Sequence, residues 1–232
     1  MNVAAIIVAA GEGLRIGGST PKTYLPLCGR PMILRTLDRV FAAKKITRVV
    51  VVVAPNEIVR SQSLLRQDGR IGSRAWQLQG GGVTRQESVR RGLETLAQDI
   101  DFVAIHDGAR PFVSSEFIDR CIEAAQEKGA VVPGLPARNT IKHVGADGYV
   151  QSTPQRSALW EIQTPQVFRR ELIQEAHDRA VREGIEATDD AMLVERMGGA
   201  VYVLEGDKLN FKITLPEDVW LAEALIREGK VA

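Results

Sequence analysis

The chain opens with an unbroken apolar run, from Val3 to Ala10, that stops at Gly11. A run of this length predicts a strand that is buried on both faces of a parallel sheet. A glycine-rich segment with Arg15 and Lys22 follows it. Loops after the first strand of such sheets lie at the carboxyl edge, where ligands bind. Glycines let backbone N–H groups surround phosphate oxygens, and cations neutralise their charge, so the segment predicts a polyphosphate-binding loop.

Two familiar glycine-rich loops do not fit this segment. The dinucleotide fingerprint needs a third glycine where the chain has Ile16, and Ala54 and Pro55 follow the second strand in place of a ribose-binding acid. The P-loop needs a lysine directly after its last glycine, but Ser19 follows Gly18. A nicotinamide oxidoreductase is therefore disfavoured. The other alternative is a solvated turn, which the order of strand, loop and cations also disfavours.

Composition narrows the class of protein. With 232 residues the chain is long enough for one sizeable core, and we expect a single domain over residues 1–232. The formal net charge is +1, which argues against nucleic-acid and membrane-surface partners. The longest apolar runs fall far short of the roughly 18 residues of a membrane helix. No basic segment precedes the first apolar run, and two cysteines make a poor disulfide framework, so we expect a cytoplasmic protein.

Segments typical of strands and of helices alternate along the chain. Thr84 with Glu87 forms a capping box for one helix, and Thr188 caps another. The first turn of that second helix holds Asp189 and Asp190, and the helix dipole accounts for both acids. The expected strands are 3–10, 48–54, 76–79, 102–106, 130–132, 200–204 and 210–213, and further helices are expected at 31–43, 55–66, 114–129, 170–183 and 214–228. The pattern predicts an α/β protein with a Rossmann-like, mostly parallel sheet flanked by helices.

Two more loops follow expected strands at the same edge of the sheet. Glycines at 80–82 precede a helix start, which turns backbone N–H groups and the positive end of the helix toward the edge. Asp107 directly follows the expected strand at 102–106, where a carboxylate can meet ribose or a phosphate-bound metal. An ordinary turn and an ion pair with Arg110 are the structural alternatives. We expect His106 to make a structural hydrogen bond.

The alternation breaks between residues 133 and 155. Residues 140–144 and 149–153 flank Asp147 and Gly148, which is a strong hairpin signal. An isolated two-stranded hairpin is marginal in water, so it should pack on another surface, such as a second subunit. We therefore expect a protruding β-hairpin dimerisation arm at 137–157, and a homodimer.

The ordered motifs resemble those of one family. AAGEGLR and PKTYLPL resemble the first-loop signature of nucleotidyltransferases that activate sugars and polyols, and GGVTRQESV resembles their base-selecting segment. Together with HDGARPFV, the arm with Thr140 and Lys142, RSALWEIQTPQVF, TDDA and GDKLNFKITLPED, they resemble the 2-C-methyl-D-erythritol 4-phosphate cytidylyltransferases of the non-mevalonate isoprenoid pathway. Enzymes that cytidylylate ribitol 5-phosphate share most of these motifs and stay an alternative. The chain ends soon after its last expected helix, so we expect no fused cyclodiphosphate synthase domain.

The resemblance implies transfer of CMP from CTP to 2-C-methyl-D-erythritol 4-phosphate, giving CDP-methylerythritol and pyrophosphate. The acceptor phosphate would attack the α-phosphorus in line with the leaving pyrophosphate. Because a phosphate monoester is largely dianionic at neutral pH, it needs no general base. Catalysis would then come from positioning and charge stabilisation, and Arg15 and Lys22 would stabilise the transition state.

The resemblance also implies the remaining site residues. Those that hold the acceptor would be Arg156, Lys212, Asp107, Arg110, Thr140 and Thr164. Those that hold the nucleotide would be Ala10, Gly11, Glu12, Gly13, Gly82 and Ser88. Mg²⁺ would bridge the CTP phosphates, with Asp107 as the nearest protein group. In such families the arm exchanges between subunits, so Thr140 and Arg156 would complete the partner's site.

Replacing Lys22 with alanine separates an enzyme from a non-catalytic nucleotide-binding subunit, which would not need both Arg15 and Lys22. We expect K22A to lose orders of magnitude in turnover, because it removes a charge from the leaving group, while the fold survives. Turnover is measured as pyrophosphate release, and folding by circular dichroism. Near-normal turnover in a folded K22A protein would rule out the electrostatic role.

Overall fold

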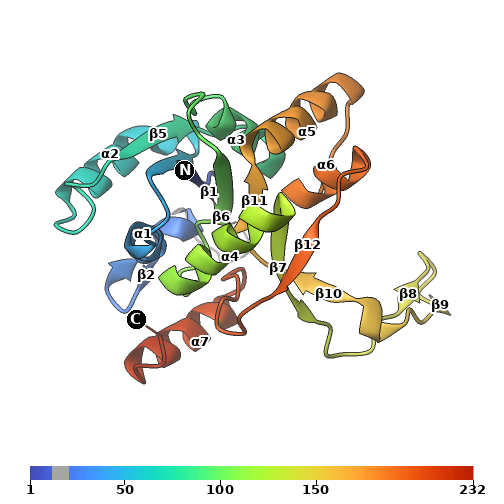
Figure 1. Ribbon diagram of the computed structural model, residues 1–232. Helices are drawn as coiled ribbons and strands as arrows, with labels where there is room; N and C mark the ends of the chain where they lie inside the picture. The colour runs from blue at the N-terminus through green and yellow to red at the C-terminus, as the bar shows by residue number, and fades with distance from the viewer. Residues whose placement is uncertain (12–20, 232) are drawn as a thin grey trace.

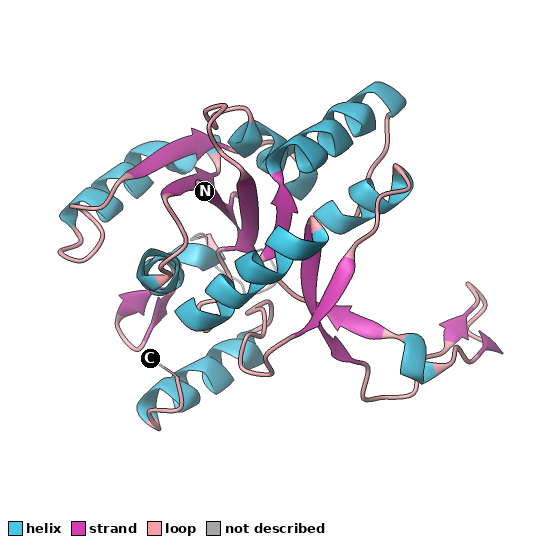
Figure 2. Ribbon diagram, in the orientation of Figure 1, coloured by secondary structure: helices cyan, strands magenta, loops and turns pink. Residues whose placement is uncertain are grey.

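The computed structural model describes residues 1–11 and 21–231, and an eight-stranded sheet forms its centre. Figures 1 and 2 show this sheet flanked by helices, with a small arm projecting from one end. The parallel half contains the strands β1 (Val3–Ala9), β4 (Arg48–Val53), β5 (Trp76–Gly80) and β6 (Phe102–Asp107). β1 pairs with β4 on one side and β6 on the other, and β5 pairs with β4. The predicted α/β fold with a mostly parallel sheet is confirmed.

The other half of the sheet is mixed. It contains β7 (Ala130–Pro136), β10 (Trp160–Ile162), β11 (Gln166–Arg169) and β12 (Tyr202–Glu205). β11 lies between β6 and β7 and is antiparallel to both, whereas β12 is parallel to β7. The strands at 160–162 and 166–169 are not expected from the sequence, because segments of three and four residues are too short to show a period. They form because they pair with longer neighbouring strands.

Helices cover both faces of the sheet because β1 is apolar on both sides. Ile7 points into a core formed with α1 (Met32–Ala42), α2 (Ile58–Gln67) and α4 (Ser115–Lys128). Ile6 points into the opposite core, formed with α3 (Arg85–Leu93), α5 (Arg170–Glu183) and α6 (Asp190–Arg196). Successive strand residues alternate between faces, so one apolar run anchors both layers. α7 (Pro216–Arg227) packs in a third, smaller cluster.

Short elements complete the fold. The strands β2 (Pro26–Leu27) and β3 (Arg30–Pro31) form a tight hairpin, whose turn residues Cys28 and Gly29 both have positive φ. Single 3₁₀ turns occur at η2 (Lys22–Tyr24), η3 (Pro55–Glu57) and η4 (Arg156–Ala158). Within the described ranges, no helix has the length and apolar character needed to cross a membrane.

Two local predictions are wrong. Residues 210–213 form no strand, because Ile213 N donates to Ala109 O and ties the segment to the loop after β6 instead of to a ladder. Thr188 does not cap α6. Asp189 does so, since its carboxylate accepts a hydrogen bond from Met192 N at 3.0 Å. Thr84 does cap α3 as predicted.

The hairpin forms, but it is shorter than predicted. β8 (His143–Val144) and β9 (Val150–Ser152) pair antiparallel, and Figure 1 shows them at the tip of an arm that leaves the sheet beyond β10. Tyr149 is 75% exposed on this arm. Dimerisation through the arm stays a prediction.

Gly92 is one of the residues through which α3 packs on the sheet. A Cβ at this position would lie 2.9 Å from Ile6 Cγ2 and 3.1 Å from Val52 Cγ2. We expect Gly92→Val to lower the free energy of unfolding by about 1–3 kcal/mol through overpacking. The matched control is Gly69→Val, since a Cβ at Gly69 meets nothing within 4 Å. Urea unfolding of both variants measures the difference, and equal losses would contradict the close contact.

Candidate active site

Ala10, which follows β1, meets the glycine-rich segment that follows β5 at the carboxyl edge of the parallel strands. A Cβ on Gly81 would lie 2.4 Å from Ala10 Cβ and 2.8 Å from Ser88 Oγ, so only glycine fits there. Gly82 N donates to Ser88 Oγ at 3.1 Å, and that hydroxyl donates to Thr84 O at 2.9 Å. The structure therefore brings three predicted nucleotide contacts together, Ala10, Gly82 and Ser88. Gly11, the next residue after Ala10, is exposed.

The first loop is only partly described. Glu12, Gly13 and Arg15 lie outside the described residues, so their predicted roles are untested. Lys22 begins η2, and its Nζ donates to Ile213 O at 3.2 Å. This contact places the predicted catalytic lysine beside the segment that carries Lys212.

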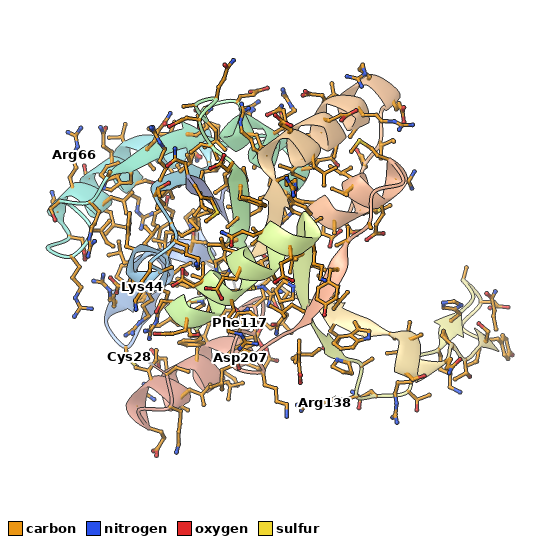
Figure 3. All side chains as sticks on the ribbon, viewed as in Figure 1. Cys28, Lys44, Arg66, Phe117, Arg138 and Asp207 are labelled. Carbon is orange, nitrogen blue, oxygen red and sulfur yellow. The ribbon has the colours of Figure 1, made fainter. Side chains whose placement is uncertain are left out.

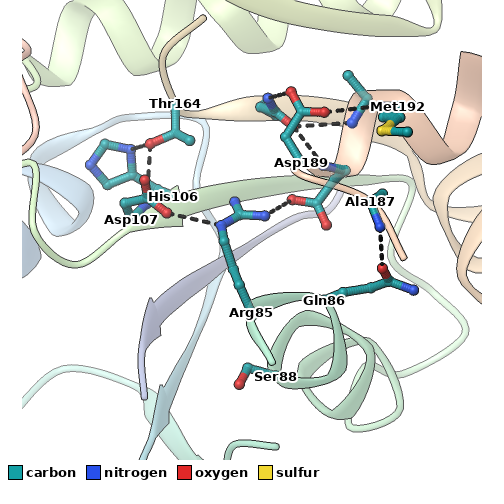
Figure 4. Close-up of polar contacts among 12 residues, drawn as sticks. Arg85, Gln86, Ser88, His106, Asp107, Thr164, Ala187, Asp189 and Met192 are labelled. Atoms are coloured by element: carbon teal, nitrogen blue, oxygen red, sulfur yellow. Dashed lines mark hydrogen bonds and ion pairs between the residues drawn. The ribbon is translucent and has the colours of Figure 1, made fainter. Parts of the chain in front are cut away.

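Asp107 emerges from β6 as a buried carboxylate that three cations surround. Lys212 Nζ lies 2.8 Å from Asp107 Oδ2, and Arg110 Nε lies 3.6 Å from the same oxygen. Arg85 Nε lies 3.2 Å from Oδ1, and Figure 4 shows the guanidinium reaching toward Asp107 from α3. Burial acts to raise the pKa of Asp107, but the charges of Arg85, Lys212 and Arg110 outweigh it and hold the pKa well below its usual range. The carboxylate is therefore ionised at neutral pH.

His106 and Thr164 fix the backbone at this point. His106 Nε2 lies 3.1 Å from Arg110 O, an acceptor, so this nitrogen carries the proton. His106 Nδ1 then accepts from Thr164 Oγ1 at 2.9 Å, and Thr164 Oγ1 accepts from Asp107 N at 3.1 Å (Figure 4). Burial lowers the pKa of His106 to about 4, which keeps the ring neutral. The predicted structural hydrogen bond of His106 is confirmed.

Two buried amides that we do not predict bring Lys212 to this edge. Asn210 Nδ2 donates to Thr164 O at 2.8 Å, and Asn210 O accepts from Arg110 Nη1 at 2.8 Å. Gln163 exchanges hydrogen bonds with the backbone of Asp207, donating to its O at 2.8 Å and accepting from its N at 3.2 Å. These bonds hold segment 207–213 against the end of β6. No local spacing signals them, because their partners lie far away in the sequence.

A cationic hollow of about 370 Å³ opens beside the cluster. Figure 3 shows Arg138 between α7 and the base of the arm. The volume suits a small ligand, and the positive charge suits one with a phosphate. Its charged lining residues are Arg110, Arg138, Lys208, Lys212 and Glu161.

The arm residues Thr140 and Arg156 are both exposed. Arg156 Nη1 donates to Arg138 O at 3.0 Å at the base of the arm. Within the described residues, no hydrogen bond or ion pair joins either residue to Asp107 or Lys212. A single chain thus gathers Asp107, Arg110, Thr164 and Lys212, but not the two arm residues.

The surroundings of Asp107 do not fit a magnesium ligand. Each of its oxygens already faces a cation, and a further divalent cation would be repelled there. Among the described residues, no three His, Cys, Asp or Glu side chains are grouped as a metal site. Mg²⁺ often binds chiefly through substrate phosphates and water.

Asp190 has a role that the helix dipole does not explain. It is 1% exposed, and its Oδ2 lies 2.7 Å from Arg85 Nη1. The dipole interpretation fits the positions of both acids, since Asp189 caps α6 and Asp190 lies in its first turn, but it does not account for the ion pair of Asp190 with Arg85. Arg85 lies in the GGVTRQESV motif and Asp190 in the TDDA motif, and these two motifs are the sequence signals that could have drawn attention to the pair.

Comparison with known proteins decides the family. Residues 3–228 match the family described as IspD, 2-C-methyl-D-erythritol 4-phosphate cytidylyltransferase. The chain belongs to this family. It is 45% identical over 227 residues to the 2-C-methyl-D-erythritol 4-phosphate cytidylyltransferase of Geobacillus kaustophilus, covering 97% of both chains. It is 42% identical to that of Caldanaerobacter subterraneus, covering 98% of this chain and all of the relative.

Solved structures of the IspD family share the fold. The crystal structure of 4-diphosphocytidyl-2C-methyl-D-erythritol synthase from Anaerococcus prevotii superposes with a TM-score of 0.86 at 32% identity, covering 97% of this chain and 98% of that chain. The 2-C-methyl-D-erythritol 4-phosphate cytidylyltransferase from Thermus thermophilus gives a TM-score of 0.77 at 36% identity, covering 96% and 98%. The resemblance inferred from the motifs is confirmed.

The neutral His106 predicts a pH dependence of stability. Its pKa is about 4 when folded and about 6.5 when unfolded, so the unfolded chain binds more protons between these values. The stabilisation is complete above pH 6.5 and is lost as the pH falls toward 4, by about 3 kcal/mol in total. We expect His106→Gln to flatten the change in unfolding free energy between pH 7 and 4.5. The exposed His143→Gln is the control, and an unchanged slope in the His106 variant would contradict the assignment.

Proposed function

We propose that this chain transfers CMP from CTP to 2-C-methyl-D-erythritol 4-phosphate, giving CDP-methylerythritol and pyrophosphate. The observation that carries this proposal is the family match across residues 3–228. The charge at the site supports it independently, because three cations converge on a single carboxylate at the carboxyl edge of the sheet. Such an excess of positive charge suits a phosphorylated acceptor and a triphosphate.

The acceptor would bind on the Lys212 side of the cluster. Lys212 and Arg110 lie between Asp107 and the cationic hollow, so each can bind a phosphate oxygen while Asp107 orients it. Thr164 Oγ1 accepts a hydrogen bond from Asp107 N and so fixes the backbone of Asp107. The acceptor phosphate is already dianionic at neutral pH, so these residues need only hold it in line with the α-phosphorus. His106 is neutral and buried, which suits a supporting role and not proton transfer.

The nucleotide would bind on the glycine-loop side. We propose contacts from Ala10, Gly11, Glu12, Gly13, Gly82 and Ser88. We also propose that Arg15 and Lys22 stabilise the charge that develops on the leaving pyrophosphate. The contact of Lys22 with Ile213 supports this division, because it sets the two predicted lysines, Lys22 and Lys212, at adjacent segments of one edge.

We propose a homodimer formed through the arm at 137–157, within a single nucleotidyltransferase domain. The arm exposes Val144, Tyr149 and Val150, which an interface would bury. Thr140 and Arg156 would then reach the acceptor of the partner subunit. Analytical ultracentrifugation tests the proposal, and a monomer at assay concentrations would contradict it.

Two further expectations concern the metal and the compartment. We propose that Mg²⁺ accompanies CTP and shields the charge of its phosphates, and that it binds the phosphates and not Asp107. Activity that persists in excess chelator would contradict the need for the metal.

We propose a cytoplasmic location, which the free thiols of Cys28 and Cys121 support. Fractionation of the native cells tests it.

The function is tested by pyrophosphate release from CTP and Mg²⁺, with 2-C-methyl-D-erythritol 4-phosphate and ribitol 5-phosphate in parallel reactions. We expect release with methylerythritol phosphate and little with ribitol phosphate. Release with ribitol phosphate alone would keep the mechanism and overturn the acceptor. No pyrophosphate release with either acceptor, in a folded protein that binds CTP, would overturn the proposed activity.

A further inference from the structure

A second buried carboxylate is linked to the acceptor site through Arg85. The Arg85 guanidinium lies between two acids, with Nε 3.2 Å from Asp107 Oδ1 and Nη1 2.7 Å from Asp190 Oδ2. Figure 4 shows Arg85 extending from the start of α3 toward Asp107. Arg85 therefore joins the end of β6 to the start of α6.

Asp190 is rigidly held from behind. It is 1% exposed, and its Oδ1 accepts a hydrogen bond from His177 Nε2 at 3.1 Å. Its backbone N donates to Gln166 Oε1 at 3.2 Å, and the same amide donates through Nε2 to Asp189 Oδ2 at 2.7 Å. Asp190 thus has fixed partners on both oxygens and on its backbone, which makes it a rigid anchor for Arg85.

The two oxygens of Asp107 contact different cations. Arg85 holds Oδ1, while Oδ2 faces Lys212 Nζ at 2.8 Å and, at the longer distance of 3.6 Å, Arg110 Nε. If Arg85 were absent, the carboxylate could rotate and Lys212 would lose its fixed partner. A lysine side chain carries about 2 kcal/mol of rotamer entropy, so it needs such a partner to stay in one place. The position of Lys212 therefore depends on an arginine that it does not touch.

Stability alone is a weak reason for this arrangement. Buried ion pairs contribute little net stability compared with apolar residues of the same size, because both charges lose their hydration. The pair nevertheless lies at the ligand-binding edge, where orientation of charged groups matters. The chain also contains a matched arrangement elsewhere. Arg30 bridges Asp38 and Asp68, at 2.8 Å from each, on the side of α1.

We propose that Arg85 and Asp190 are positioning residues that hold Asp107, and through it Lys212, in place for the acceptor phosphate. This rests on the proposed function, because the role of Lys212 toward the acceptor comes from it. Neither residue touches the acceptor in this scheme. They act by fixing the orientation of one carboxylate.

Steady-state kinetics with CTP and 2-C-methyl-D-erythritol 4-phosphate test this on R85Q and D190N. We expect each to lower kcat/KM for the acceptor by about ten-fold or more, with KM for CTP changed by less than about two-fold. A merely structural role would lower the amount of active enzyme and leave the acceptor KM unchanged. That result in both variants would overturn the proposal.

A double-mutant cycle tests the route of the coupling. In a D107N background, Arg85 has no carboxylate to orient, so adding R85Q should lower kcat/KM for the acceptor by less than about a further two-fold. A loss as large as in the intact chain would show that Arg85 acts without Asp107, and would overturn the proposal.

R30Q is the control for losing an arginine between two acids. We expect it to lower the melting temperature as R85Q does while kcat/KM stays unchanged. An equal loss of kcat/KM in R30Q would also overturn the proposal.

Crystal structures of R85Q and D190N give a readout that needs no activity. We expect Lys212 Nζ to move beyond hydrogen-bond distance of Asp107 Oδ2 in both variants. An unchanged contact in both would overturn the proposal. A wild-type chain that releases no pyrophosphate would refute the proposed function instead, and the crystal structures would still decide whether Arg85 and Asp190 position Lys212.

Discussion

The carboxylate of Asp107 holds the charged edge of this protein together. Arg85, Arg110 and Lys212 come from three separate segments, and all three meet this one side chain. Without a shared anion, three cations at such distances would repel one another. Removing one member of a buried ion pair typically costs about 3–5 kcal/mol, because the remaining charge loses its partner. The positions of Lys212 and Arg110 therefore depend on Asp107, whereas Arg85 is also anchored by Asp190.

The position of Asp107 follows in turn from the first apolar run. β1 pairs with β6 so that Val8 lies opposite Asp107, and with β4 so that Ala9 lies opposite Val53. Parallel pairing brings the ends of these strands to one edge, together with Ala10 and the glycines that follow β5. A strand that is apolar on both faces fixes this register, since a slip by one residue would disturb both cores. The site is thus located by packing and specified by a few charges.

The residues themselves predicted the parts of this site that are local in sequence. The first strand, the cap at Thr84 and the acid at the end of β6 each follow from a short pattern. Lys212 could be placed only by its resemblance to the family, because more than half the chain separates it from the first loop. The strand predicted at 210–213 was wrong for a related reason. The backbone N–H of Ile213 donates to Ala109 O in the loop after β6 and not to a neighbouring strand. The ion pair of Asp190 was missed because the helix dipole gave a sufficient local explanation for this acid, and its partner, Arg85, is distant in sequence.

The most direct measurement is the steady-state rate of D107N with CTP and 2-C-methyl-D-erythritol 4-phosphate, alongside its melting temperature. If Asp107 organises the site, kcat/KM for the acceptor should fall by about 100-fold, which corresponds to about 2.7 kcal/mol, in a protein that stays folded. A folded D107N enzyme with nearly wild-type kcat/KM would contradict this account. The cations would then hold their positions without the carboxylate they share.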